Sequence, residues 1–152
     1  MNLKTHKNIL SKKEQKDLLA FVKTKVQSLG EDYPGLQTKS DLHTYKELHP
    51  FLKKINIHIK SNKIDMCWCN YTDGSYISWH NHEGSKYSLV YYLKSPQKLG
   101  VMFKNGKYGI KYTEGLENSL AIKKIVFLCV VVVSGGIGCD LIHTRCKINV
   151  KK

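Results

Sequence analysis

The chain has 152 residues, a length that suits one globular domain and is too short to favour two. Hydrophobic residues make up 41% and charged residues 24%, a balance that excludes an intrinsically disordered chain. The formal net charge of +13 indicates attraction to anionic partners. However, the basic residues are 24 lysines spread along the chain and one arginine, Arg145. Specific phosphate or base recognition usually uses arginine, so nucleic acid stays an alternative partner that we do not favour.

The cysteines and the apolar segments predict a compartment. Five cysteines form no CxxC pair, and their odd number leaves one unpaired in any disulfide scheme, which favours reduced thiols and a cytoplasmic protein. Residues 1–15 lack the apolar core of a signal peptide. The apolar run at 125–133 suits a buried strand and is too short for a membrane span, so we expect no membrane partner.

Two helices are predicted in the first part of the chain. Residues 11–28 begin with a capping box of Ser11 and Glu14 and end before Gly30 and the turn at 32–35. A second amphipathic helix is predicted at about 46–60. The apolar positions expected to face the core are Leu18, Leu19, Phe21, Val22 and Val26 in the first helix, and Leu48, Phe51, Leu52, Ile55 and Ile57 in the second.

Short strands are predicted after Asn62, where aromatic and β-branched residues fall into runs separated by turn-forming segments. Eight antiparallel strands are enough to build two facing sheets. We therefore expect a single domain over 1–152, with a helical lead-in at 1–62 and a core of strands at 63–150. The predicted strands are 64–71, 75–80, 87–94, 100–104, 108–112, 118–122, 125–133 and 141–150.

One pair of histidines suggests a metal site. His80 and His82 lie two residues apart at the end of the predicted strand 75–80, so both imidazoles can reach one metal ion. Imidazole nitrogen suits iron, zinc, copper and nickel. A His-x-His pair alone is a weak motif, so its neighbours must decide what it means.

The neighbouring segments resemble the small 2-oxoglutarate and Fe(II)-dependent oxygenases related to prolyl hydroxylases. Trp68, Asn70 and Gly74 precede the histidine pair, and the strand YSLVYYL, Pro96 and Gly100 follow it. The sequence GLQTKSDLH at 35–43 resembles the element that precedes the barrel in these proteins, and NILSKKEQKDLL at 8–19 resembles their leading helix. The resemblance covers residues 8–122. It implies a mainly β fold with N-terminal helices and a double-stranded β-helix (jelly-roll) core.

The activity implied by the resemblance is that of a hydroxylase-type dioxygenase. Its cofactors would be Fe(II) and the cosubstrate 2-oxoglutarate, with ascorbate as a candidate accessory reductant, and its substrate an unknown small molecule or peptide. By the resemblance His80 takes the first metal position and His82 the second, where the family commonly has Asp. Glu83 is the alternative carboxylate ligand.

The expected cosubstrate site centres on Arg145. A guanidinium offers two parallel donors to the distal carboxylate of 2-oxoglutarate, and Arg145 is the only one in the chain. The resemblance places it on the last strand, followed by Asn149. Tyr91 and Tyr92 alternate across the strand after the histidine pair, so one of them faces the interior, and Tyr92 is assigned to the cofactor-binding set with Asn70.

The third metal ligand is where the chain departs from the family pattern. A histidine is expected about ten residues or more before Arg145, and residues 121–140 contain none. His143 is the remaining candidate, although it would share a strand with Arg145, whereas the family places the two on neighbouring strands. Cys129 as a substitute ligand, a site with two protein ligands, and a site that has lost activity all stay open.

Two further interpretations use a similar barrel. The spacing from Gly74 to His80 and His82 also matches the opening of the cupin metal motif, but Lys86 and Tyr87 stand where a cupin has a glutamate. The other is a degenerate jelly-roll or cupin-like binding module without catalysis. Such a module would bind nucleic acid or an acidic partner through its basic surface.

Overall fold

The protein is described by a computed structural model. It describes the backbone of residues 3–28, 36–59, 64–72, 77–80, 87–95, 100–105, 109–114, 116–124, 129–133 and 141–148. Side chains are described within the ranges 3–28, 36–59, 64–71, 87–95 and 116–121.

Helices and short strands alternate in the first 60 residues. Strand β1 (Leu3–Lys7) is followed by helix α1 (Lys12–Lys23), and the short strands β2 (Gln27–Ser28) and β3 (Leu36–Gln37) come next. Two 3-10 turns, η1 (Leu42–Thr44) and η2 (Lys46–Leu48), lead into helix α2 (His49–Ile59). The strands that follow are β4 (Met66–Thr72), β5 (Ile77–His80), β6 (Tyr87–Lys94), β7 (Gly100–Asn105), β8 (Gly109–Glu114), β9 (Ser119–Lys124), β10 (Cys129–Val133) and β11 (Leu141–Ile148).

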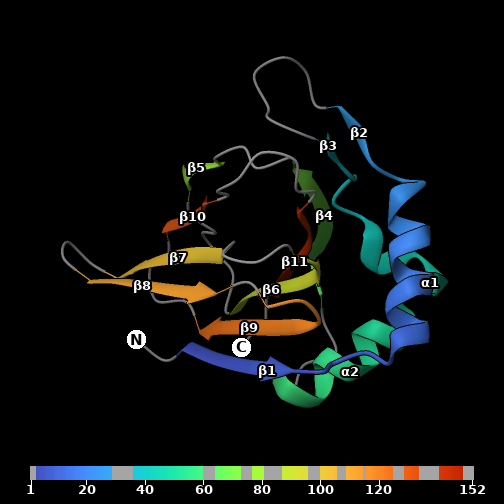
Figure 1. The fold of residues 1–152 in the computed structure, drawn as a ribbon, viewed down its shortest axis with the longest axis horizontal. Coiled ribbons are helices and arrows are strands. Elements are labelled where there is room, and N and C mark those ends of the chain that lie inside the picture. Colours follow the sequence, from blue (N-terminus) through green and yellow to red (C-terminus); the bar gives the residue numbers. More distant parts are fainter. Residues whose placement is uncertain are drawn as a thin grey trace.

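The described strands form two sheets. One sheet has seven strands in the order β1-β9-β6-β11-β4-β3-β2, and the other has four in the order β5-β10-β7-β8. Neighbouring strands within both sheets are antiparallel. From β4 onward the chain passes from one sheet to the other at every connection except β7 to β8. Figure 1 shows α1 and α2 on one side of the seven-stranded sheet and the four-stranded sheet on the other.

Helix α1 begins as predicted. The Ser11 side chain accepts from the Glu14 backbone N–H, and the Glu14 carboxylate accepts from the Ser11 backbone N–H at 2.7 Å, which completes the capping box. The helix ends at Lys23, five residues before the predicted end. It stops early because the backbone N–H of Thr24 and the Thr24 hydroxyl both turn back to carbonyl groups of the last turn, and the chain then becomes extended at Gln27.

Helix α2 packs through a different stripe from the one predicted. Ile57 was expected in the core, but its side chain is 74% exposed, whereas Ile59 is buried. The buried positions 51, 52, 55 and 59 recur at helical spacing from the observed start of the helix, and position 57 falls outside that stripe. The predicted helix at 46–60 begins with the turn η2, and the α-helix proper begins at His49.

The main core lies between the helices and the seven-stranded sheet. Leu18 and Val22 of α1 and Phe51 and Ile55 of α2 pack against one face of β4, β6 and β9. Leu19 and Phe21 pack against this core from its margin. On the sheet the buried residues of the core are Cys67, Cys69, Leu89, Tyr91, Leu93 and Leu120.

Each of the eight predicted strands after residue 62 is present, with ends that differ by a few residues. Strands β1, β2 and β3 were not predicted. Strand β1 pairs along its whole length with β9 at one edge of the sheet. Within the described residues, the structure contains no helix with the length and hydropathy required to cross a bilayer.

Candidate functional site

The seven-stranded sheet has two buried faces of different character. Alternation along β4 and β6 sends Cys67, Cys69 and Tyr91 toward the helices. The positions between them, including Trp68, Asn70 and Tyr92, are also buried but do not belong to the helix-packed core. We call this second set the inner face, and it consists of Trp68, Asn70, Ser88, Val90, Tyr92, Ser119 and Ala121. In Figure 1 the four-stranded sheet lies on this side.

The inner face is the more polar of the two. Among the described side chains, four buried residues are polar and not aromatic, and three of them, Asn70, Ser88 and Ser119, lie on it. Tyr92 adds a phenol that is 0% exposed. Because buried polar groups are stable only when they have partners, such a face is either a hydrogen-bonded interior or a binding site.

Strand pairing places several predicted site residues in a single row. His143 of β11 lies directly opposite Asn70 of β4 and Tyr92 of β6, and Tyr92 lies opposite Ser119 of β9. Directly opposite positions in antiparallel strands share a face of the sheet. The predicted set of Asn70, Tyr92 and His143 therefore occupies adjacent register positions, although these residues are far apart in the sequence.

Arg145 occupies the next row on the same strand. Its backbone lies opposite Trp68 of β4 and Val90 of β6, two residues along from His143. Trp68 is 8% exposed and Val90 is 1% exposed, and both belong to the inner face. The side chains of His143 and Arg145 lie outside the described part of the structure.

His80 lies in the other sheet. It is the last residue of β5, and its backbone is opposite Val130 of β10. Cys129, the alternative ligand, is the neighbouring residue on β10 and pairs with Lys104 of β7. The register position across from His80 thus holds a valine, a residue type whose side chain has no metal-ligating atom.

Some of the predicted site lies outside the described residues. His82, Glu83 and Asn149 fall in this part of the chain, and so do the side chains of His80 and Cys129. Among the side chains that are described, no group of three or more His, Cys, Asp or Glu residues comes together as metal ligands. The metal ligand set remains a prediction.

Residues 36–43, the described part of the segment at 35–43, lie near one edge of the same sheet. Gln37 of β3 lies opposite Asn70, and the Thr38 backbone N–H donates to the Cys69 carbonyl at 3.0 Å. The Thr38 hydroxyl accepts from the Cys69 N–H at 3.0 Å and donates to the Lys39 carbonyl at 2.9 Å. Thr38 is 1% exposed, so these bonds satisfy a buried hydroxyl and fix this segment against β4.

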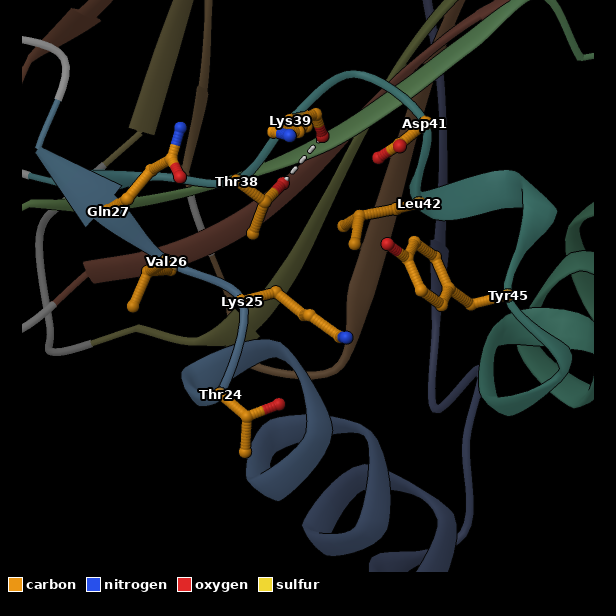
Figure 2. Close-up of a pocket in the computed structure, with 9 residues that line it drawn as sticks. All are labelled: Thr24, Lys25, Val26, Gln27, Thr38, Lys39, Asp41, Leu42 and Tyr45. Atoms are coloured by element: carbon orange, nitrogen blue, oxygen red, sulfur yellow. Dashed lines mark hydrogen bonds between the residues drawn. The ribbon is translucent and has the colours of Figure 1, made fainter.

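A cavity of about 270 Å³ lies beside this segment, between the end of α1 and η1. Thr24, Lys25, Val26 and Gln27 line one side, and Thr38, Lys39, Asp41, Leu42 and Tyr45 line the other (Figure 2). Its lining contains none of the inner-face residues. The cavity is therefore separate from the predicted metal and cosubstrate site.

The ring of Tyr91 belongs to the helix side of the sheet. It packs against Phe51 with ring centroids 4.7 Å apart, and its hydroxyl donates to the Asn118 side-chain oxygen at 2.8 Å. Burial raises the pKa of the Tyr91 hydroxyl above its ordinary value, and the carboxylates of Glu117 and Glu14 raise it further. Tyr91 is thus a neutral structural group, which leaves Tyr92 as the tyrosine of this pair on the inner face.

No protein-family model and no curated protein sequence matches the chain. Solved structures do match its backbone. The viral collagen prolyl hydroxylase of Paramecium bursaria Chlorella virus-1, solved as a 2OG complex, aligns with a TM-score of 0.71 and 13% identity over 99% of this chain and 97% of its own. A 2OG-Fe(II) oxygenase family oxidoreductase from Burkholderia pseudomallei aligns with a TM-score of 0.74 and 8% identity, covering 97% and 84% of the two chains.

A third match is HygX from Streptomyces hygroscopicus, solved with nickel and 2-oxoglutarate bound. It aligns with a TM-score of 0.72 and 7% identity over 95% of this chain and 81% of its own. The chain shares the fold of these oxygenases. The fold family implied by the sequence resemblance is therefore supported by backbone architecture.

The structure also places residues on the inner face that the sequence analysis did not single out. Ser88 and Ser119 are 2% and 1% exposed and lie beside Val90 and Tyr92. For Ser88 a signal was available, because alternation along the strand YSLVYYL puts positions 88, 90 and 92 on one face. For Ser119 it was not, since its place depends on pairing with β6.

Proposed function

We propose that the protein is a 2-oxoglutarate and Fe(II)-dependent dioxygenase of the hydroxylase type. The observation that carries the proposal is the polar row on the inner face, where position 143 stands between Asn70 and Tyr92 and position 145 lies in the adjacent row. The likeness of the backbone to solved oxygenases supports the same proposal.

We take the two sheets to be the halves of a double-stranded β-helix. The eight strands β4 to β11 fall into the sets β4-β11-β6-β9 and β5-β10-β7-β8, which is the interleaving that a rolled strand pair produces. In this arrangement the inner face of the larger sheet looks toward the smaller one. The end of β5, with His80, and the middle of β11 then border one interior.

His80 and His82 are our proposed metal ligands, with His143 as the third. Neutral imidazole is a suitable donor for Fe(II), and three protein ligands leave positions open for the cosubstrate and oxygen. Position 143 is favoured because its register partners Asn70 and Tyr92 are 1% and 0% exposed on the inner face. Position 129 is not favoured, because His80 lies opposite Val130 and not opposite Cys129.

Arg145 is our proposed anchor for the distal carboxylate of 2-oxoglutarate. A guanidinium binds a carboxylate through two parallel N–H donors, and the interaction is strongest where water is excluded. Trp68 and Val90, the register partners of Arg145, supply apolar wall on either side of its strand. The phenol of Tyr92 and the amide of Asn70 are the neutral groups that orient the cosubstrate, and Asn149 is assigned to the same set.

Bound Fe(II) and 2-oxoglutarate would supply the oxidising chemistry of hydroxylation, with ascorbate as a candidate accessory reductant. The protein's own residues position the cosubstrate and exclude water. Buried Asn70, Ser88 and Ser119 provide a fixed set of dipoles beside it, so little reorganisation is needed when charge moves. The substrate is a small molecule or peptide whose identity depends on the loops around this interior.

Binding of 2-oxoglutarate to the iron-loaded protein without oxygen tests the cosubstrate assignment apart from turnover. Arg145→Lys should raise the Kd of 2-oxoglutarate about tenfold, because an ammonium lacks the two parallel N–H donors of the guanidinium. Arg145→Gln should raise the Kd further, because it also removes the positive charge. Lys16→Gln, which removes an exposed charge on α1 away from the inner face, is the matched control. Equal affinity in wild type and Arg145→Gln would reject the assignment of Arg145.

The alternative is a binding module of the same fold without catalysis. The observation that favours it is Val130, which stands across from His80 on the strand where a third ligand is expected. Such a module would use the +13 charge to bind nucleic acid or an acidic protein. Binding that weakens steeply with salt and does not require iron would support this alternative.

A further inference from the structure

The cavity beside β3 carries charged groups that the fold itself does not pair. Lys25 and Asp41 both line it, and both side chains are only partly exposed. The ion pairs between residues that the structure describes are Lys13 with Asp17 and Lys54 with Glu14, so Lys25 and Asp41 pair neither with each other nor with another described residue. Partly buried charges without partners are unfavourable unless solvent or a ligand supplies the missing interaction.

The Lys25 ammonium is held in position by aromatic rings and not by a carboxylate. Its Nζ lies 4.6 Å from the ring centroid of Tyr45 and 5.6 Å from that of Phe21. The two rings are themselves 5.5 Å apart and tilted by 57°. Neither ring is a carboxylate, so the ammonium has donors left for an anionic ligand.

The opposite wall of the cavity presents the Asp41 carboxylate. The backbone of Asp41 is fixed, because its carbonyl accepts from the backbone N–H and the hydroxyl of Thr44 at 2.9 and 2.8 Å. Asp41 also forms a parallel bridge with Cys67 of β4. Figure 2 shows Asp41, Tyr45 and Lys25 around the same space, with the Lys25 chain reaching toward Tyr45. A second cation, Lys39, lines the same cavity and is exposed.

We propose that this cavity binds an acidic α-amino acid. Its α-carboxylate would bind Lys25, its α-ammonium Asp41 and its side-chain carboxylate Lys39. Two cations and one anion in the wall match the two carboxylates and one ammonium of such a ligand. The volume of about 270 Å³ is just below the range for small-molecule pockets, roughly 300–1,000 Å³, which suits a ligand as small as an amino acid.

This site is distinct from the proposed oxygenase site. Its wall includes Thr38, whose backbone N–H and hydroxyl form hydrogen bonds with the backbone of Cys69 on β4. The cavity therefore lies beside β4 along the sheet and not on the inner face. Binding in the cavity requires neither iron nor 2-oxoglutarate. The proposal therefore stands or fails independently of the proposed function.

Calorimetric titration with L-aspartate and succinate tests it, because the two probes differ only in the ammonium group. We expect saturable binding of L-aspartate and at least tenfold weaker binding of succinate. Lys25→Met should weaken aspartate binding about tenfold or more, and Asp41→Asn should remove the preference for aspartate over succinate. Lys16→Met, an exposed lysine of α1 outside the cavity, is the control and should bind aspartate as the wild type does.

Two further measurements locate the site and check folding. Arg145→Gln should leave aspartate binding unchanged, which separates this cavity from the proposed 2-oxoglutarate site. Circular dichroism should show that Lys25→Met and Asp41→Asn remain folded, since neither side chain has an ion-pair or hydrogen-bond partner among the described residues. The proposal is overturned by equal affinity for the two probes, by binding unchanged in both cavity variants, or by no saturable aspartate binding up to the millimolar range.

Discussion

The Tyr91 hydroxyl donates a hydrogen bond to the Asn118 side-chain oxygen at 2.8 Å, which joins the middle of β6 to the turn before β9. The same oxygen accepts from the Leu10 N–H at 2.9 Å, and the Asn118 side-chain amide donates to the Leu10 carbonyl at 2.7 Å. Asn118 has φ of 57°, a conformation that asparagine tolerates better than most residues. One residue thus ties the segment before α1, strand β6 and the start of β9 together.

Asn118→Ala should be strongly destabilising. The substitution removes the hydrogen-bond partners of Leu10 and Tyr91. It also leaves alanine in the left-handed region, where its side chain forms no hydrogen bond that offsets the strain. Together these effects predict a loss of about 2–4 kcal/mol in the free energy of unfolding. Asn118→Gly should lose about 1 kcal/mol less, because glycine adopts this conformation without strain. Urea unfolding of both variants measures the difference. A loss under about 0.5 kcal/mol for Asn118→Ala would contradict this role.

The buried Tyr91 hydroxyl should make folding stability fall at alkaline pH. Burial raises the pKa of its hydroxyl in the folded state, so the unfolded chain releases this proton near the ordinary value of 10.0 while the folded chain keeps it. Folding stability should then fall as pH rises through 10.0, by up to about 1.4 kcal/mol per pH unit from this group. The measurement is urea unfolding on both sides of that pH. Tyr91→Phe should show a shallower decline, and an identical decline in both proteins would contradict the assignment.

The Glu14 carboxyl should make folding stability fall at acidic pH, whereas the Tyr91 hydroxyl makes it fall at alkaline pH. Hydrogen bonds from Lys54 and Ser11 lower the pKa of the Glu14 carboxyl from 4.5 to about 2. Its stabilising contribution is therefore present above 4.5 and is lost as pH falls from there toward 2. Thermal unfolding across this interval should show a smaller decrease for Glu14→Gln than for wild type. Lys13→Met, which breaks the exposed pair with Asp17, controls for loss of a surface ion pair.

The strands and helices show how far sequence patterns reach in this chain. The runs predicted as strands at 87–94 and 100–104 are rich in aromatic and branched residues, and they form β6 (Tyr87–Lys94) and β7 (Gly100–Asn105). Strand β1 has only Leu3 and His6 partly buried, and strands β2 and β3 are two residues long, so none of them has a periodicity that sequence analysis detects. Their structure comes from pairing with β9 and β4.

The sequence suggested candidate residues for the site but could not predict how they are arranged. Alternation correctly separated Tyr91 from Tyr92, because it depends only on neighbours along one strand. The row formed by Asn70, His143 and Tyr92 depends on β11 inserting between β4 and β6, which is a pairing between distant segments. No local pattern encodes that register, so the sequence alone could not show that these positions are adjacent.

A gain-of-ligand variant tests the proposed metal set. Val130 lies opposite His80, so Val130→His should add an imidazole beside the first ligand and lower the Kd of iron about tenfold. Val131→His, on the alternate position of the same strand, should not. If His143 is the natural third ligand, His143→Ala should weaken iron binding and Val130→His should restore it in the double variant. If His143→Ala weakens iron binding and Val130→His does not restore it, β10 does not border the metal site.

The central proposal, an oxygenase site between the two sheets, is tested most directly by succinate release from 2-oxoglutarate. Purified protein with Fe(II), ascorbate and oxygen should convert 2-oxoglutarate to succinate, and His80→Ala should abolish the conversion while His49→Ala, an exposed histidine at the start of α2, leaves it unchanged. Succinate release by His80→Ala at the wild-type rate, or none from the iron-loaded wild type, would contradict the account.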